Sequence, residues 1–331
     1  MPDSNRSTPV PVTILTGFLG AGKTTLLNRI LSEEHGHRIA VIENEFGEEG
    51  IDSDLLIQGE EQIVEMNNGC ICCTVRGDLV RILGDLAEKR ENGSLHFERV
   101  IIETTGLADP APVAQTFFVE RDIGEYYLLD AIITVVDAKH ALKQLDDNHE
   151  AEEQVGFADR LLLSKTDLIT SAEATELEAR LRGINARAPI AHVHFGETDI
   201  SEILDIRGFS LNAILDIEPD FLDDVSHEHD AGITSFVYRT DRAMDAAKII
   251  AFMDVMVRDY GNDLLRYKGI VHIAGCDRKI IYQGVHMLLA DSIGVPWAID
   301  EIRLSVLVFI GRNLPKQAIH EALDGCRVLT C

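Results

Sequence analysis

The sequence lacks the segments by which a chain enters a membrane or a secretory route. No apolar run approaches the roughly 20 residues that are needed to span a bilayer. The stretch from Met1 to Thr8 is polar and has no apolar region of the kind found in signal peptides. There is also no internal repeat and no low-complexity tract. We therefore expect a cytoplasmic protein, in which the six cysteines are interpreted as thiols or metal ligands before disulfides.

Basic residues are also scarce. The chain has 30 Lys and Arg residues against 56 Asp and Glu residues, which gives a formal net charge of -26. This balance argues against nucleic acid or an anionic membrane as a partner. It suits a protein that handles cations, although many soluble enzymes are acidic. With 331 residues, of which 46% are hydrophobic, the chain is long enough for two domains with a buried core.

The most informative stretch near the start is a glycine-rich loop that matches G-x-x-x-x-G-K-[ST]. It follows an apolar, β-branched run from Val10 to Leu15 and opens a predicted helix from Thr24 to Leu31. Strand, glycine-rich turn and helix together are the context in which this pattern binds phosphate. Lys23 is expected to neutralise the β- and γ-phosphates, and the Thr24 hydroxyl to ligate Mg²⁺. The predicted nucleotide-binding residues here are Gly17, Phe18, Leu19, Gly20, Ala21, Gly22, Lys23, Thr24 and Thr25.

Apolar runs and helical stretches alternate over the following part of the chain. The predicted strands are 38–44, 62–66, 99–103, 131–137, 160–165 and 189–194, and the predicted helices include 76–90, a stretch through His140 and His149, and 172–186. This alternation predicts an α/β domain, residues 1–215, with a mainly parallel sheet covered by helices on both faces. Ligands of such sheets bind at the carboxyl edge, where the phosphate loop and the later loops meet.

The pattern changes after residue 215. Residues 216–232 form an acidic linker that contains His227 and His229. Residues 233–331 are predicted to form a smaller α+β domain with an antiparallel sheet. Its expected strands are 233–239, 265–274, 279–288 and 303–310, and its expected helices are 245–260 and 315–323.

Two further motifs follow predicted strands of the first domain. Glu103-Thr-Thr-Gly106 stands where a P-loop protein needs an acid near Mg²⁺ and a glycine amide near the γ-phosphate. Most such proteins use Asp at this point, so Glu103 is expected to act through a metal-bound water. A carboxylate that caps the next helix is the structural alternative.

Ser164-Lys165-Thr166-Asp167 occupies the position of a base-reading loop. There the Asp167 carboxylate would accept two N–H bonds from guanine, which adenine does not offer, and the Lys165 stem would lie along the base. A wrong base leaves that carboxylate unpaired. The motif therefore favours GTP over ATP, with Ser164 in a place that Asn commonly occupies.

A cysteine triplet indicates what the nucleotide controls. Cys70, Cys72 and Cys73 are too close in sequence for an unstrained disulfide. Three thiolates suit a soft or borderline cation such as Zn²⁺ or Cu⁺, whereas buried packing suits one thiol better than three. A fourth ligand is left open between Glu43, Glu48, a water and a residue of a partner.

Four histidines are weaker candidates for metal binding. His192 and His194 alternate along a predicted strand, and His227 and His229 lie in the linker. For any one of them a solvated or core histidine is the simpler interpretation.

The motifs together resemble the CobW/YjiA family. Gly17–Thr24, Glu43–Gly47, Gly69–Cys73, Glu103–Gly106 and Ser164–Asp167 occur in the order seen in that family, and the resemblance continues in Leu264–Gly269, Gln283–Val285 and Val308–Gly311. It implies a P-loop GTPase of the SIMIBI class with a small CobW-type C-terminal domain. It also implies zinc or a related metal as cargo for client proteins, held by Cys70, Cys72 and Cys73 with Glu43 and Glu48 as additional ligands.

The resulting hypothesis is a GTP-hydrolysing metal chaperone that uses GTP, Mg²⁺ and Zn²⁺, with hydrolysis gating metal release. No arginine finger is identifiable, so slow hydrolysis is expected. The alternatives are a small-molecule P-loop kinase, a non-catalytic zinc buffer, and a GTPase that inserts nickel, cobalt or iron. A client metalloprotein is the expected partner, and homo-oligomerisation is left open.

Overall fold

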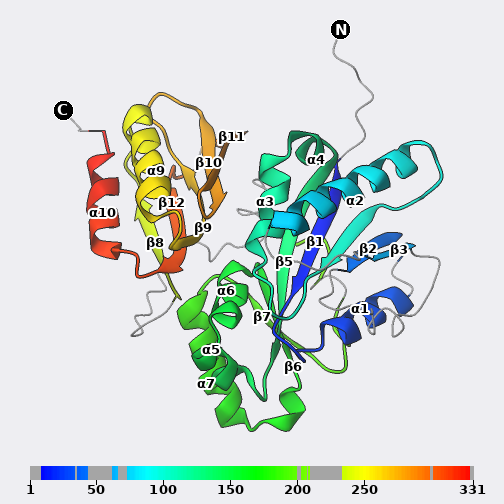
Figure 1. Ribbon diagram of the computed structural model, residues 1–331. Coiled ribbons are helices and arrows are strands. Elements are labelled where there is room, and N and C mark those ends of the chain that lie inside the picture. The colour runs from blue at the N-terminus through cyan, green and yellow to red at the C-terminus, as the bar shows by residue number, and fades with distance from the viewer. Residues whose placement is uncertain are drawn as a thin grey trace. The chain divides into compact units, whose positions relative to one another are not determined.

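A computed structural model describes residues 9–33, 36–43, 62–65, 73–199, 203–206, 208, 233–298 and 301–328. Contacts divide the chain into two compact units (Figure 1). The first comprises Met1–Gln154, Ala158–Thr175 and Pro189–Ile206, and the second comprises Val155–Phe157, Glu176–Ala188 and Arg207–Cys331. Each contains one β-sheet with its own helices.

The first sheet is parallel and has the order β3-β2-β4-β1-β5-β6-β7. Its strands are β1 (Val10–Thr16), β2 (Ile39–Glu43), β3 (Gln62–Glu65), β4 (Arg99–Glu103), β5 (Tyr127–Asp137), β6 (Arg160–Ser164) and β7 (Ile190–Val193). Both faces are covered, because neighbouring residues such as Ile14 and Leu15 are each at most 1% exposed although they point to opposite faces. The predicted α/β class with a mainly parallel sheet is confirmed.

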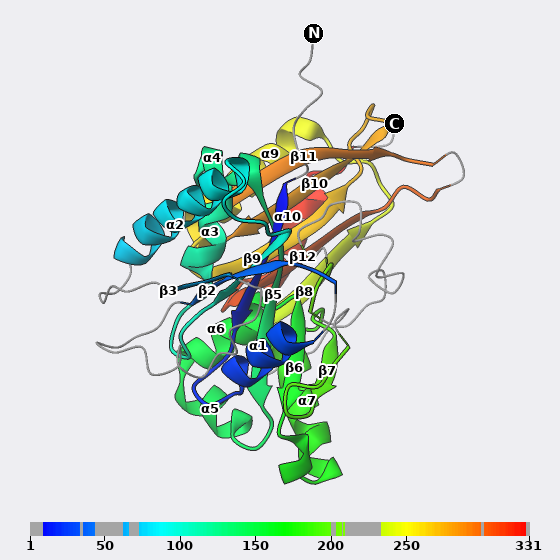
Figure 2. The ribbon, with the colours of Figure 1, turned by 90° about the vertical axis from the view of Figure 1, so that its right-hand side faces the viewer.

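Helices cover the two faces of this sheet. Those of the first unit are α1 (Lys23–Ser32), α2 (Cys73–Glu91), α3 (Ala111–Val119), α4 (Arg121–Tyr126) and α5 (Ala141–Asp147), with a 3₁₀ turn η2 (Thr166–Leu168). Two more helices, α6 (His149–Phe157) and α7 (Ser171–Ile184), begin in the first unit and end in the second. Leu27 and Ile30 of α1 belong to a core cluster with Ile101 and Ile133 of the sheet. Helices α2, α3 and α4 lie side by side (Figure 2), and the Tyr127 hydroxyl of β5 donates to the Leu83 carbonyl of α2 at 2.8 Å.

Two helix boundaries differ from the sequence prediction. Helix α2 begins at Cys73 rather than Arg76, so the cysteine motif runs directly into the helix. The helical stretch predicted through His140 and His149 is two helices, because Asn148 is extended and its side-chain amide donates to the Gln144 carbonyl at 3.2 Å. His140 is the N-cap residue of α5 and lies just before that helix.

The second sheet is antiparallel and has the order β11-β10-β9-β12-β8. Its strands are β8 (Ile233–Thr240), β9 (Leu264–Val271), β10 (Arg278–Val285), β11 (Leu288–Pro296) and β12 (Ser305–Arg312). The strand predicted over 279–288 ends earlier, at Val285, and the chain turns through His286, whose φ of 52° is left-handed. Strand β11 then pairs with β10, which the sequence prediction missed.

Helices α9 (Ala246–Tyr260) and α10 (Lys316–Gly325) pack on one face of this second sheet. Asp245 caps α9 by accepting from the Lys248 N–H at 3.0 Å. One core cluster joins the helices to the sheet, and it contains the fully buried Ile249 of α9, Leu323 of α10 and Phe309 of β12. The predicted smaller α+β domain with an antiparallel sheet is therefore confirmed.

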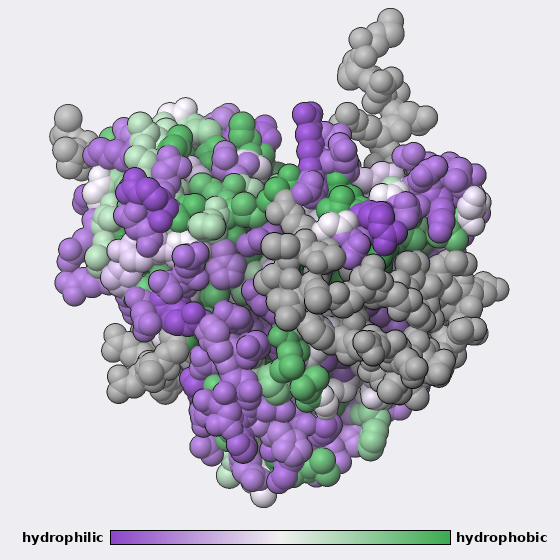
Figure 3. Space-filling view, in the orientation of Figure 1, coloured by the Kyte–Doolittle hydropathy of each residue, from purple (hydrophilic) through white to green (hydrophobic). Residues whose placement is uncertain are grey.

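The surface carries no sign of a membrane span in the described residues. Within them, no helix combines the length and the apolar character that crossing a bilayer requires. The surface over α5, α6 and α7 is mostly hydrophilic in the view of Figure 3.

Candidate phosphate and metal site

The loop between β1 and α1 has the backbone of a phosphate cradle. Gly17, Gly20 and Gly22 have φ values of 143°, 74° and 103°, a region that side chains with a Cβ rarely adopt. A Cβ on Gly17 would lie 2.3 Å from the Val135 carbonyl oxygen of β5, so only glycine fits there. The close approach of the two backbones fixes where the loop leaves the sheet.

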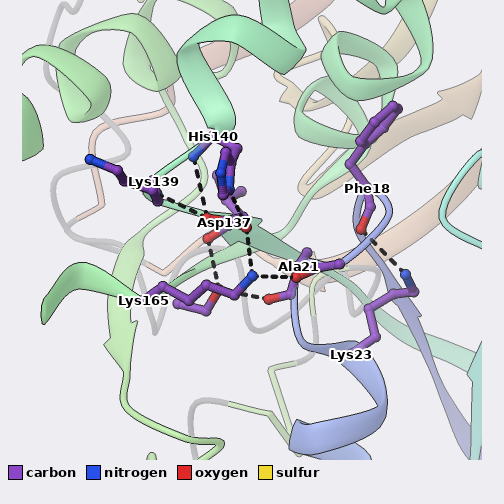
Figure 4. Close-up of polar contacts among 10 residues, drawn as sticks. Phe18, Ala21, Lys23, Asp137, Lys139, His140 and Lys165 are labelled. Atoms are coloured by element: carbon purple, nitrogen blue, oxygen red, sulfur yellow. Dashed lines mark hydrogen bonds and ion pairs between the residues drawn. The ribbon is translucent and has the colours of Figure 1, made fainter. Parts of the chain in front are cut away.

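Lys23 is folded back over this loop. It is 8% exposed, and its Nζ atom donates to the Gly17 carbonyl at 2.8 Å and to the Phe18 carbonyl at 3.5 Å (Figure 4). Helix α1 begins at Lys23, and its N-cap Gly22 supplies no side chain to bond the first N–H groups. A helix N-terminus without a side-chain cap, next to a positive charge, matches the donor set that phosphate oxygens require.

The end of β4 reaches the same loop. The Thr24 hydroxyl donates to Glu103 Oε1 at 3.3 Å. The two strand ends are tied together as well, since the Thr104 hydroxyl donates to the Thr16 hydroxyl at 2.8 Å. A hydroxyl and a carboxylate are hard oxygen donors of the type that Mg²⁺ prefers. The Thr24 hydroxyl and the Glu103 carboxylate, 3.3 Å apart, therefore fit the ion.

The loop after Glu103 lies against the phosphate loop. A Cβ on Gly106 would lie 2.7 Å from the Leu19 backbone nitrogen, so a larger residue would push the two loops apart. Gln154 of α6 is 1% exposed and donates to the carbonyls of Gly106 at 3.2 Å and Ala108 at 3.0 Å. This buried amide holds the loop in place, and nothing in the sequence motif indicated it.

The end of β6 also contacts the phosphate loop. The Ser164 hydroxyl donates to the Ala21 carbonyl at 2.6 Å, and the Val136 carbonyl oxygen lies 3.2 Å from the same hydroxyl. Ser164 is 8% exposed. A side chain as short as serine therefore fits between the loop and β5, which explains the departure from the more common Asn.

Lys165 follows with a left-handed φ of 56°. Its Nζ atom donates to the Gly20 carbonyl at 2.7 Å and to Asp137 Oδ2 at 2.6 Å (Figure 4). The lysine thus joins three segments: the phosphate loop, the end of β5 and the end of β6. Its alkyl stem is fixed at both ends, as the predicted base-stacking role requires.

Asp137 organises this junction. Its side chain is 3% exposed and accepts from the Lys139 N–H at 2.9 Å and from His140 Nδ1 at 3.0 Å, in addition to Lys165. Burial pushes the pKa of Asp137 upward, but the hydrogen bonds and charges of Lys165 and His140 outweigh it and hold the pKa below its ordinary value of 3.8. The carboxylate is therefore charged when it holds the lysine.

The base-reading candidate Asp167 lies in the 3₁₀ turn η2, and its side chain is 44% exposed. His194 Nδ1 lies 3.7 Å from Asp167 Oδ1, and the His194 ring meets the Phe195 ring edge-on at 4.7 Å between centroids. Phe195 is 76% exposed with a left-handed φ of 48°. An exposed aromatic ring and a carboxylate, each next to the His194 ring, are groups that a purine base uses for stacking and hydrogen bonding.

The segment around Gly196 packs against α1, a contact that the sequence pattern does not predict. A Cβ on Gly196 would lie 2.9 Å from the Thr25 carbonyl oxygen. His192 and His194 are both exposed, with buried Val193 between them, as the predicted alternation requires.

The metal side of the site is described only in part. Glu43 ends β2 and stands in register with Glu103 on the adjacent strand β4. Cys73 is the first residue of α2. The other predicted ligands, Cys70, Cys72 and Glu48, and the linker histidines His227 and His229, lie outside the described residues.

Among the described residues there is no group of three or more His, Cys, Asp or Glu side chains that could hold a metal ion. Cys276 and Cys326 are free thiols of the second unit. The cysteine motif therefore stays a prediction, with Glu43 the one proposed ligand whose side chain the structure describes.

Comparison with known proteins gives the site its context. Residues 11–192 match the family described as CobW/HypB/UreG, nucleotide-binding domain, and residues 233–327 match the cobalamin synthesis protein CobW C-terminal domain. The zinc chaperone YjiA of Escherichia coli (strain K12) is 42% identical over 320 residues, which cover 96% of this chain and 99% of that protein.

Two further comparisons agree. The zinc-regulated GTPase metalloprotein activator 1 of Dictyostelium discoideum is 32% identical over 384 residues, covering 96% of this chain and 79% of that protein. The crystal structure of Zn(II)-bound YjiA GTPase from E. coli has a TM-score of 0.77 and 36% sequence identity, and the match covers 97% of this chain and 100% of that one. The resemblance predicted from the motifs is confirmed.

Proposed function

Since the chain belongs to the CobW/HypB/UreG family of nucleotide-binding proteins and carries a CobW C-terminal domain, we propose that it is a GTPase that binds zinc and transfers it to client metalloproteins. Relatives named as a zinc chaperone and as a zinc-regulated GTPase metalloprotein activator support both halves of this proposal. The nucleotide and the metal are bound at one edge of the first sheet, and hydrolysis of the nucleotide gates release of the metal.

The nucleotide half rests on residues that are already close together. The backbone of Gly17 to Thr25 binds the phosphates, and Lys23 exchanges its bond to the Gly17 carbonyl for the β- and γ-phosphate oxygens. Thr24 and Glu103 hold Mg²⁺, directly and through water respectively. When bound, the ion neutralises charge that develops on the phosphates. The Gly106 amide faces the γ-phosphate, and Gln154 keeps the loop of Gly106 in place.

Preference for guanine follows from the second group of residues. The Asp167 carboxylate accepts N–H bonds from the base, and the Lys165 stem lies along its face. Ser164 holds the reading loop against Ala21 of the phosphate loop, so base and phosphate contacts are set relative to each other. An adenine would leave the Asp167 carboxylate without a donor, which disfavours ATP.

One observation carries the coupling of nucleotide to metal. Glu43 and Glu103 are neighbours in register on β2 and β4, and Glu103 in turn accepts a hydrogen bond from Thr24. The other proposed zinc ligands, Cys70, Cys72, Cys73 and Glu48, belong to the segments that follow β2 and β3 or open α2. A change at the γ-phosphate can therefore reach a zinc ligand across one strand spacing, about 4.8 Å.

The proposal also covers the roles of the domains, the compartment, the partners and the metal. We assign hydrolysis to residues 1–215, with 216–232 as a linker and 233–331 as the C-terminal domain. The chain acts in the cytoplasm, with a client metalloprotein as partner and without nucleic acid or membrane. Zinc is favoured over nickel, cobalt or iron because the relatives are named for zinc.

Two rivals predict different results. A P-loop kinase for a small metabolite predicts a phosphorylated product rather than free phosphate and gives the cysteines no role. A non-catalytic zinc buffer predicts that Lys23→Ala leaves metal transfer intact. The proposal predicts free phosphate and loss of gated transfer in that variant.

The test compares GTP turnover and bound zinc in the purified full chain and in a Cys70/Cys72/Cys73→Ala variant. Cys276→Ala is the matched control, because it removes a free thiol of the second unit. We expect the triple variant to lose bound zinc and the zinc dependence of its turnover, and the control to keep both. Unchanged zinc content and turnover in the triple variant would refute the metal half.

A further inference from the structure

A cavity in the second unit has properties that the proposed function does not use. It lies between strand β8 and helix α10 and has a volume of about 360 Å³, within the usual range for ligand sites of roughly 300–1,000 Å³. Residues 237–239 of β8 form one wall. Lys316, His320 and Asp324 of α10 form the other, and Arg327 lies at one end.

The helix wall is a single face of α10. Lys316, His320 and Asp324 recur every four residues, so they stand above one another on the same side of the helix. Ile319 and Leu323 point instead into the core of the domain. Helix α10 therefore packs its apolar face into the core of the domain, and its polar face borders the cavity.

The strand wall is an edge of the sheet. Strand β8 is the last strand in the order β11-β10-β9-β12-β8, and in the part of the chain that the structure describes it pairs with β12 alone. That pairing runs over the full strand, from Ile233 to Thr240. The opposite side of an edge strand presents backbone N–H and C=O groups with the spacing of a further strand.

The charge of the cavity is opposite to that of the chain. Its lining carries three cationic side chains, Arg239, Lys316 and Arg327, against one carboxylate, that of Asp324. The chain as a whole has a net charge of -26. Within the described residues Arg239 and Lys316 form no ion pair, whereas Arg327 is paired with Asp324. Two cations at the walls are thus available to an anionic partner.

Hydrogen bonds and ring contacts already hold Tyr238 and His320, which line the cavity. Tyr238 is 3% exposed, its hydroxyl donates to Asp324 Oδ1 at 2.9 Å, and it accepts from Arg327 Nε at 3.1 Å. The His320 ring lies 5.5 Å from the Tyr238 ring and 5.6 Å from the Phe236 ring. Binding therefore does not have to order these side chains, which favours affinity.

We propose that this groove binds an extended acidic segment of a partner protein, which adds to β8 as a further strand. The backbone of the segment pairs with the edge of β8 that no described strand occupies, and its carboxylates meet Arg239 and Lys316. Strand addition supplies affinity through main-chain bonds, and side-chain pockets supply selectivity. The excess of cations selects against basic segments and favours fast association with acidic ones. The proposal concerns recognition alone and stands whether or not the chain carries zinc.

The test uses the full chain and a fluorescent peptide of the same length as β8 that alternates Glu and Val. Two comparison peptides replace Glu by Lys, or carry N-methyl groups on alternate backbone nitrogens of the Glu–Val peptide. Arg239→Glu and Lys316→Glu reverse charges at the groove. Arg258→Glu reverses an exposed charge on α9 that does not line the cavity and is the matched control.

Fluorescence anisotropy should show saturable binding of the Glu–Val peptide. We expect each groove variant to weaken it by about tenfold, which corresponds to about 1.4 kcal/mol. The control should bind as the unchanged chain does. The Lys and N-methyl peptides should bind at least tenfold more weakly, because the first loses charge-assisted bonds to the groove and the second loses main-chain hydrogen bonds to β8. Equal binding of the N-methyl peptide would overturn strand addition, and equal binding of the Lys peptide would overturn the charge argument.

Sedimentation of the chain without peptide completes the design. A dimer that the Arg239→Glu variant abolishes would assign the edge to a second copy of the chain and overturn the proposal. Absence of saturable peptide binding up to about 1 mM, the weakest range useful for recognition, would overturn it as well.

Discussion

Asp137 offers a sharp test of how the nucleotide site is organised, because it touches the base-reading lysine without belonging to any of the motifs. The perturbation is Asp137→Asn, which keeps the size of the side chain and one acceptor oxygen. That oxygen can still accept from the Lys139 N–H, while the new amide group opposes the ammonium of Lys165. The substitution thus removes the charge-assisted bond to Lys165 together with the contact to His140 Nδ1, which uses the same carboxylate oxygen.

The magnitude follows from the contacts. A hydrogen bond to a charged group contributes about 1.5–3 kcal/mol to stability. The Lys165 side chain is 36% exposed, so solvent screening places this pair at the lower end, about 1.5 kcal/mol. A lysine released from Asp137 must be ordered again when nucleotide binds, and ordering a lysine costs up to about 2 kcal/mol. We therefore expect GDP to bind about tenfold more weakly.

The assay is calorimetric titration of the protein with Mg²⁺–GDP and with Mg²⁺–ADP, beside chemical unfolding. His140→Gln is the control, since it removes only the exposed partner of Asp137. We expect the variant to lose affinity for both nucleotides by a similar factor, because the Lys165 stem lies along the face of either base, and the control to keep its GDP affinity. Equal GDP affinity in Asp137→Asn and the unchanged protein would refute the positioning role.

The sign of the pH dependence provides a second reading of the same variant. The pKa of Asp137 lies below 3.8 in the folded protein, so its contribution to stability is present above that pH and is lost as the pH falls through the lowered value. The difference in unfolding free energy between the two proteins should be constant near neutral pH and shrink below about 3.8. A difference that grows on acidification would contradict this assignment.

The remaining predictions concern the phosphate loop and the base. Gly17→Ala should abolish GDP binding, because its Cβ would lie 2.3 Å from the Val135 carbonyl, whereas Gly20→Ala meets no atom within 4 Å and should cost only backbone strain of about 1–2 kcal/mol. Calorimetry on both variants checks this, and equal losses would contradict it. Asp167→Asn should shift nucleotide preference from GDP toward xanthosine diphosphate, since xanthine carries a carbonyl where guanine carries an amino group. Competition binding measures the ratio, and an unchanged ratio would remove Asp167 from base reading.

Several elements of the fold could be predicted closely because their sequence patterns are local. Strand β4 was predicted over its observed bounds, 99–103, because a short β-branched run there is closed by the charged residues Arg99 and Glu103. Strand β11 was missed because its pattern is weak: Ala290, Asp291 and Ser292 are partly or fully exposed, and Gly294 interrupts it. Its place depends on pairing with β10, which is a tertiary contact that no local pattern records.

The residues of the site divide in the same way, into those with a local sequence pattern and those that depend on a tertiary contact. The phosphate loop, Glu103 and the Ser164–Asp167 loop could be found because their residue types stand at fixed spacings after strands. Asp137, Gln154 and Phe195 could not, because each acts through a contact with a segment distant in sequence. The positive φ of Phe195 and its exposure are the signals that mark it, and both become visible only in the folded chain.

The central claim is that nucleotide state controls zinc binding, and one measurement tests it most directly. The zinc affinity of the full chain is measured with a competing chelator in the presence of GDP and of a non-hydrolysable GTP analogue, each with Mg²⁺. Because coupling is reciprocal, zinc must change the ratio of the analogue and GDP affinities by the same factor, which for coupled sites is typically about 5–150-fold. The account predicts a difference within that range in both directions of the cycle. Equal zinc affinities in the two nucleotide states would contradict it.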